Sequence, residues 1–142
     1  MKALASLILA LLPVCGFGMD RLSALSMLET GNDDRAIGSA GEISRFQVKK
    51  AEWQSVTNSA NYCDSETARK VMIQIMDKRI HAFHDHFGRQ PNDFEFYALW
   101  NAPAQAMKGR ITPLVASRCE RFANLCERDR QLAQMAKAKQ TW

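Results

Sequence analysis

The feature that most constrains the fold is a long apolar stripe in the middle of the chain. Apolar residues recur there at spacings of three and four: Met72, Met76, Ile80, Phe83 and Phe87. This spacing places them on one face of an α-helix. Asp64 or Ser65 is a suitable N-cap, and Gly88 is a suitable end because glycine tolerates the left-handed conformation. The sequence therefore predicts a central core helix over about residues 65 to 87.

Shorter helical patterns flank this segment. We expect helices at about residues 21–29, 49–57 and 91–101, and from 112 onward. Pro103 is expected to end the third of them. The intervening Gly/Ser-rich loop spans residues 33–44, with a short strand or hairpin expected around residues 43–48. A chain of 142 residues with this pattern suits one mostly α domain.

The first eighteen residues have the composition of a secretory signal peptide. Lys2 precedes an almost wholly apolar run from Ala3 to Val14, and Gly16-Phe17-Gly18 supplies a small-x-small cleavage site. The run is shorter than the roughly 20 residues that cross a bilayer, so no stable membrane insertion is expected after cleavage. We expect residues 19–142 to form a monomeric domain in the periplasm or outside the cell.

The charge of the chain is weakly basic. Its formal net charge is +4, and loss of Lys2 with the leader leaves +3, which suits an anionic polymer. Nucleic acid is not an expected partner, because no basic run, phosphate loop or aromatic RNA-binding motif occurs. No cofactor is implied. We expect no metal site either, since His81, His84 and His86 lack a His-Glu-x-x-His pattern.

Three cysteines remain after cleavage: Cys63, Cys119 and Cys126. On one helix the last two would lie about 10 Å apart along the axis, which is too far for a disulfide. Two alternatives stay open for an exported domain. Either Cys63 pairs with one of the other two and leaves a free thiol, or all three are buried and reduced.

Glu29 is the candidate catalytic residue. It ends an apolar helical run beside Leu25 and Leu28, and a loop of Gly, Asn and Asp follows at once. This position would seat a carboxyl half in the core and half in a cleft, where partial burial favours the protonated form that a general acid needs. An ordinary solvated role is less favoured, since a negative charge at a helix C-terminus opposes the helix dipole.

Short motifs follow Glu29 in a recognisable order. They are Glu29-Thr30-Gly31, Ala36-Ile37-Gly38, Gly41-Glu42-Ile43-Ser44, Gln47 and, later, Trp100-Asn101-Ala102-Pro103. In lytic transglycosylases and goose-type lysozymes a helix ends in Glu-Ser-x. An Ala/Gly pair, a Gly-Ala-x-Gly stretch, a Gln and, further on, Tyr-Asn-Ala-Gly follow it. The region from Leu22 to Pro103 resembles this lysozyme-like group.

The resemblance implies a single lysozyme-like domain, with a small irregular or β-hairpin region beside a catalytic cleft. It implies cleavage of the β-1,4 bond between N-acetylmuramic acid and N-acetylglucosamine in peptidoglycan. Glu29 would be the single acid and base, and the sugar's C6 hydroxyl would attack in place of water. The expected substrate-binding residues are Glu42, Gln47, Tyr97, Trp100 and Asn101.

Departures from the family pattern leave alternatives open. Trp100 replaces a tyrosine whose hydroxyl lies close to the catalytic carboxyl in the family, and Tyr97, one turn earlier, is the candidate substitute. Glu42 either activates water, which would make the protein a hydrolytic muramidase or chitinase, or orients Arg45 through a local ion pair. A catalytically inactive glycan-binding or scaffold module is the remaining alternative.

Overall fold

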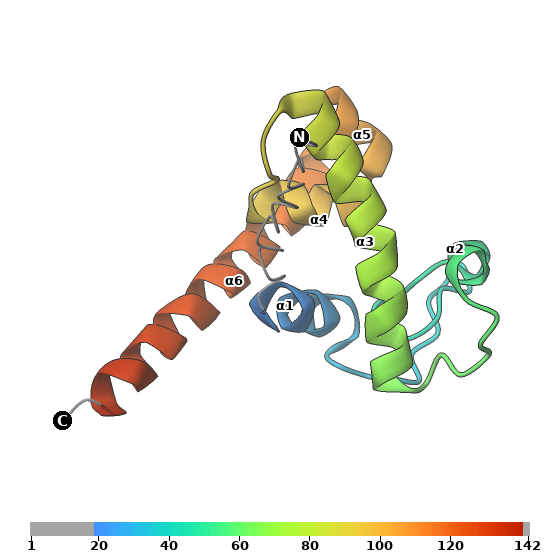
Figure 1. Cartoon of the computed structure of the whole chain (residues 1–142), viewed down its shortest axis with the longest axis horizontal. Coiled ribbons are helices and arrows are strands. Elements are labelled where there is room, and N and C mark those ends of the chain that lie inside the picture. The colour runs from blue at the N-terminus through green and yellow to red at the C-terminus, as the bar shows by residue number, and fades with distance from the viewer. Residues whose placement is uncertain (1–18, 141–142) are drawn as a thin grey trace, which may run out of the picture.

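The computed structural model describes residues 19–140, which form six helices (Figure 1). These are α1 (Met19–Thr30), α2 (Lys50–Val56), α3 (Ser65–Phe87), α4 (Asp93–Asn101), α5 (Pro103–Lys108) and α6 (Pro113–Gln140). The mostly α class is thus confirmed. Within the described range no strand forms, and the expected hairpin is reduced to one antiparallel bridge between Ile43 and Val48. The expected signal peptide, residues 1–18, lies outside the described residues.

The central helix α3 is the one that the apolar stripe predicts. The carboxylate of Asp64 caps it by accepting a hydrogen bond from the backbone N–H of Thr67 at 2.8 Å. Gly88 ends it in the left-handed conformation, with φ 70°. The stripe is buried as far as Phe83, whereas Phe87 is 38% exposed. In Figure 1, α3 lies between α2 on one side and α1 and α4 on the other.

Pro103 begins a helix, which the sequence did not predict. It was expected only to end the helix before it, but α4 ends at Asn101 and Pro103 is the first residue of α5. Proline suits a first helical position, because its missing N–H would have no intrahelical partner there. Two short helices at an angle therefore replace the expected helix and loop.

The packing of α4 against α6 holds the core together. Five consecutive residues of α4 are buried: Phe96, Tyr97, Ala98, Leu99 and Trp100. The ring of Phe122, on α6, lies 5.6 Å from that of Phe96 and 5.4 Å from that of Tyr97. The C-terminal part of α6 extends away from the other helices as an arm (Figure 1). No helix of residues 19–140 is both long enough and apolar enough to span a bilayer.

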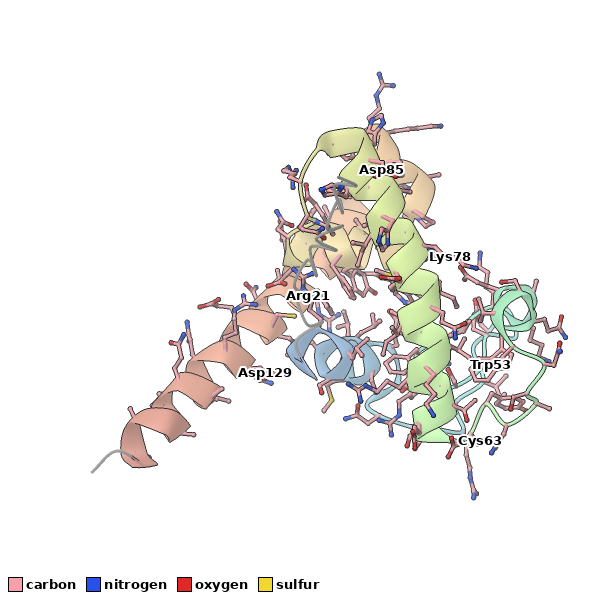
Figure 2. All side chains as sticks on the ribbon, in the orientation of Figure 1. Arg21, Trp53, Cys63, Lys78, Asp85 and Asp129 are labelled. Atoms are coloured by element: carbon pink, nitrogen blue, oxygen red, sulfur yellow. The ribbon has the colours of Figure 1, made fainter. Side chains whose placement is uncertain are left out.

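The three cysteines of the described region are free thiols. Cys63 is exposed in the loop before α3 (Figure 2), and Cys119 and Cys126 are buried on α6. Burial raises the pKa of Cys119 to about 11 and that of Cys126 to about 12, so both stay protonated at neutral pH. The alternative with a Cys63 disulfide is therefore wrong for this structure. The alternative with three buried, reduced cysteines is right for Cys119 and Cys126 but wrong for Cys63, which is exposed.

Asp93 joins the start of α4 to two other helices. Its Oδ1 accepts from Nε of Arg21 at 2.7 Å, and its Oδ2 lies 2.8 Å from Nη1 of Arg130. Figure 2 shows Arg21 between α1 and the base of α6. Burial raises the pKa of Asp93, but the ion pairs with Arg130 and Arg21 outweigh it and leave the pKa below the ordinary 3.8. The native fold therefore favours the ionised carboxylate.

We expect Asp93→Asn to lower the free energy of unfolding by about 1–2 kcal/mol at pH 7. Because the folded-state pKa is lowered, this contribution is present above the ordinary pKa and is lost as the pH falls through the folded pKa. Urea unfolding at several pH values measures it. Asp85→Asn is the matched control, since the side chain of Asp85 is 82% exposed. An Asp93→Asn effect that stays constant down to strong acid would contradict this account.

Candidate active site

Two hollows share α2. One, of about 310 Å³, is lined by three carboxyl groups, those of Glu29, Glu42 and Glu52. The other, of about 410 Å³, contains Trp53 and Tyr62 among its lining residues, and no carboxyl, thiol or imidazole lines it within the described chain. Of these two hollows, only the first is lined by carboxyl groups, which can act as general acids or bases. We refer to it as the cleft.

The cleft gathers residues from separate parts of the chain. Five of the six residues expected from the sequence line the cleft: Glu29, Glu42, Gln47, Trp100 and Asn101. The sixth, Tyr97, does not. Tyr97 is 2% exposed and approaches Glu29 from the core. It lies behind the acid because α4 packs this whole turn into the core. The expectation that Tyr97 lines the cleft is therefore corrected.

Glu29 and Tyr97 form the central pair of the site. The Tyr97 hydroxyl donates to Oε1 of Glu29 at 2.8 Å, which is the proximity that the family resemblance implies for a tyrosine. Burial raises the pKa of Tyr97 above its ordinary 10, so the phenol keeps its proton and remains a donor. One carboxyl oxygen of Glu29 is thus held in place. The half-buried carboxyl still lines the cleft.

Burial raises the pKa of Glu29 above its ordinary 4.5. The Tyr97 hydrogen bond, the charge of Arg118 and the Trp100 side chain act in the opposite direction, while the charge of Glu42 raises the pKa further. The balance is upward. Glu29 therefore keeps its proton to a higher pH than a solvated glutamate, as a general acid requires.

The loop between α1 and α2 places Glu42 and Gln47 around Gly38. Oε2 of Glu42 accepts from the backbone N–H of Ala40 at 3.0 Å, and Nε2 of Gln47 donates to the carbonyl oxygen of Ser44 at 3.2 Å. A Cβ at position 38 would collide with both the Glu42 carboxylate and the Gln47 amide. Glycine is therefore needed there for both side chains to keep these positions.

Arg45 pairs with Asp34 and not with Glu42. Its Nε and Nη2 donate to the two carboxylate oxygens of Asp34 at 2.6 and 2.9 Å. The interpretation that Glu42 orients Arg45 is therefore wrong. Sequence proximity suggested that pair, but Ser44 lies between the two residues in a left-handed turn, with φ 67°. Glu42 has no ion pair within residues 19–140.

Sequence reasoning missed the cations of the cleft and one of its acids: Lys49, Glu52, Arg79 and Arg118. Arg79 donates through Nη1 to the carbonyl oxygens of Leu99 at 2.8 Å and Trp100 at 2.9 Å, and through Nη2 to Glu52. It thereby ties α3 to the end of α4 and to α2. A signal existed, because Arg79 follows Met76 by three residues and precedes Phe83 by four, so it falls along the apolar stripe.

Neither similarity nor metal chemistry identifies a ligand for the cleft. Comparisons with protein-family models, curated proteins and solved structures find no match. Within residues 19–140, no three His, Cys, Asp or Glu side chains are grouped to hold a metal ion. His81 and His84 instead lie exposed on α3 beside Asp77 and Asp85.

We expect Tyr97→Phe to raise the pKa of Glu29 further. The variant removes a donor that favours the carboxylate, while the ring that packs on Phe122 remains. Titration of the ¹³C-labelled Glu29 carboxyl by NMR measures the shift. Tyr62→Phe is the control, because Tyr62 lines the other hollow and should leave Glu29 unchanged. An unchanged or lowered pKa in Tyr97→Phe would show that the hydroxyl does not act on Glu29.

Proposed function

We propose that the protein is a lysozyme-like lytic transglycosylase that cleaves the β-1,4 bond between N-acetylmuramic acid and N-acetylglucosamine in peptidoglycan. One observation carries the proposal: the half-buried carboxyl of Glu29 lines a polar cleft, has a raised pKa and accepts a hydrogen bond from Tyr97. The motifs between Leu22 and Pro103 support the same assignment. Export through a cleaved signal peptide is part of the proposal, because peptidoglycan lies outside the cytoplasmic membrane.

In the proposed reaction Glu29 acts twice. Its protonated carboxyl first gives a proton to the glycosidic oxygen as the bond from that oxygen to C1 of N-acetylmuramic acid breaks. N-acetylglucosamine leaves with a free C4 hydroxyl, and the N-acetyl group of the other sugar stabilises the positive charge at C1. The Glu29 carboxylate then takes the proton of the C6 hydroxyl while the oxygen on C6 bonds to C1 of the same sugar. The product ends in a 1,6-anhydro sugar, and Glu29 regains its proton.

The neighbours of Glu29 have distinct roles in this scheme. Tyr97 holds Oε1, and the Glu29 carboxyl still lines the cleft, where it would reach the glycosidic oxygen. Trp100 is only 8% exposed and lies under the guanidinium of Arg79, 5.4 Å from the ring centre. It therefore forms a wall of the cleft and offers little area for stacking on a sugar. The exposed amide of Asn101 and that of Gln47 are the groups suited to an N-acetyl group.

Hydrolysis is the second candidate function, and Glu42 is the observation that favours it. Its carboxylate lines the same cleft, and its negative charge raises the pKa of Glu29. The two carboxyl groups are thus close enough to interact. A second carboxylate can activate water, as in glycosidases that use two acids. Attack by water would leave a reducing sugar in place of the anhydro end.

Mass spectrometry of the fragments released from purified peptidoglycan tests the proposal. Muropeptides lighter by one water, with anhydro ends, are the expected products. Reducing ends would establish a hydrolase and assign Glu42 as the base. If the protein releases nothing but still sediments with the polymer, the enzymatic proposal fails and the protein is a glycan-binding module.

A further inference from the structure

We propose that Lys49 and Arg118 form a carboxylate-binding subsite in the cleft, which selects glycans that carry carboxylates over neutral chitin-like glycans. The inference rests on the proposed function and deepens it, because it names the substrate feature that the cleft recognises. It starts from the charges that line the cleft, three acidic and three basic: Glu29, Glu42, Glu52, Lys49, Arg79 and Arg118.

One acid and one cation in this set already have each other as partners. Arg79 pairs with Glu52 and donates to two backbone carbonyl oxygens, so its charge is used within the protein. Burial raises the pKa of Glu29 in spite of the opposing hydrogen bond from Tyr97, so this carboxyl ionises less readily than a solvated one. The third acid of the cleft is Glu42, and its carboxylate already accepts a hydrogen bond from the backbone N–H of Ala40.

The other two cations of the cleft, Lys49 and Arg118, have no ion pair in the described part of the chain. Lys49 lies directly before α2, and Arg118 lies on α6 next to the buried Cys119. They approach the cleft from two different elements, and both side chains are exposed. Neither cation is taken by an acid of the cleft, because Glu52 pairs with Arg79 and the Glu42 carboxylate accepts from a backbone N–H. The cleft is therefore suited to a ligand with a negative group.

Arg118 is the stronger of the two ligands. A guanidinium presents a planar fork of N–H donors that matches the two oxygens of a carboxylate. Its backbone is firmly placed, because Cys119 and Phe122 anchor this part of α6 in the core. Arg118 and Glu29 line the same cleft, so a carboxylate bound to Arg118 would share that cleft with the bond to be cleaved. Lys49, in the segment directly before α2, adds a second donor to the same cleft on a flexible side chain.

Peptidoglycan offers two sources of this chemistry. The peptide stems carry free carboxylates, whereas the lactyl carboxyl of N-acetylmuramic acid is free only where the peptide has been removed. Chitin has the same backbone linkage and N-acetyl groups but no carboxylate. The three glycans therefore separate charge recognition from sugar recognition.

Isothermal titration calorimetry with the Glu29→Gln protein tests the subsite without cleavage. The ligands are glycan tetramers of equal length: peptide-bearing, peptide-stripped with free lactyl groups, and chitotetraose. We expect at least one carboxylate-bearing glycan to bind about tenfold more tightly than chitotetraose, as one charge-assisted hydrogen-bonded contact allows. Preference for the first identifies the stem carboxylate, and preference for the second identifies the lactyl group.

Second substitutions in the same background assign the preference to residues. Arg118→Gln should reduce it about tenfold, Lys49→Gln should reduce it less, and Arg118→Lys should keep part of it. Arg121→Gln and Lys50→Gln are matched controls, because these neighbouring exposed cations do not line the cleft. The proposal is overturned if all three glycans bind equally, or if Arg118→Gln weakens chitotetraose binding as much as that of the anionic glycans.

These outcomes separate this inference from the proposed function. If the wild type releases no fragments but Glu29→Gln still prefers carboxylate-bearing glycans through Arg118, the enzymatic proposal fails and the subsite stands. If cleavage occurs but the preference is absent, the subsite fails and the enzyme stands.

Discussion

Glu29→Gln is expected to reduce the release of muropeptides by about 10²- to 10⁴-fold, because an amide cannot supply the proton that the leaving oxygen needs. The geometry of the site survives the change, since the amide oxygen of glutamine can accept the Tyr97 hydrogen bond at the position of Oε1. The initial rate of release from purified peptidoglycan measures the effect. An activity within a few fold of wild type would remove Glu29 from the reaction.

Glu42→Gln is the matched control, because it neutralises another carboxylate of the same cleft. A transglycosylase does not need a second carboxylate to activate water, so the variant should keep most of its activity. A hydrolase that uses Glu42 as its base would lose activity in both variants. The pair of substitutions therefore tests the acid and the reaction outcome together.

The same Glu29→Gln change is expected to stabilise the fold at neutral pH. Because the folded-state pKa of Glu29 is raised above 4.5, its ionisation opposes folding. This penalty is absent below the unfolded pKa and develops as the pH rises through the folded pKa. Urea unfolding should show a variant at least as stable as wild type at pH 7, with the difference closing below about pH 4. A less stable variant would contradict the burial that the proposed mechanism requires.

Phe122→Ala is expected to lower the free energy of unfolding by about 3–5 kcal/mol, the usual range for removing a buried phenylalanine ring. Phe122 is fully buried, and its ring lies against those of Phe96 and Tyr97 at the contact between α4 and α6. Alanine would leave a cavity that two flanking helices cannot close without moving. Equilibrium unfolding in urea measures the loss.

The Phe122→Ala effect should extend to the site, since this ring supports Tyr97 and Tyr97 holds Glu29. Phe122→Leu keeps most of the volume and should cost less than the alanine variant. Leu114→Ala, at a residue of α6 that is 71% exposed, should change stability by less than about 0.5 kcal/mol. If Phe122→Ala and Leu114→Ala were equally mild, α6 would not be the support that its packing indicates.

The helices that were predicted well are those whose signals are local. The spacing of Met72, Met76 and Phe83 predicts α3, and the residues that cap it adjoin it in the sequence. Where one local signal has two uses, prediction was incomplete: α4 ends before Pro103 as expected, but the start of α5 at Pro103 was not predicted. Pro103 is compatible with both a helix end and a helix start, and only the packing of α5 beside α4 decides between them. The hairpin expected around residues 43–48 is only a single bridge between Ile43 and Val48, because the turn between them contains left-handed residues at Ser44 and Gln47.

The sequence by itself determined the mostly helical class, the limits of the central helix and the choice of Glu29 as the candidate acid. The helices depend on periodicity and caps, which act over a few residues, and the choice of Glu29 depends mostly on the motifs that resemble lysozyme-like enzymes, together with the abrupt change of composition after it. Only the tertiary structure decided that Tyr97 lies behind Glu29, that Asp34 takes Arg45, and that Arg118 faces the same cleft. Glu29 and Tyr97 are 68 positions apart. Contacts of that kind depend on which faces of α1, α4 and α6 pack together. The apolar area buried between whole helices determines which faces pack, and no short motif in the sequence predicts that packing.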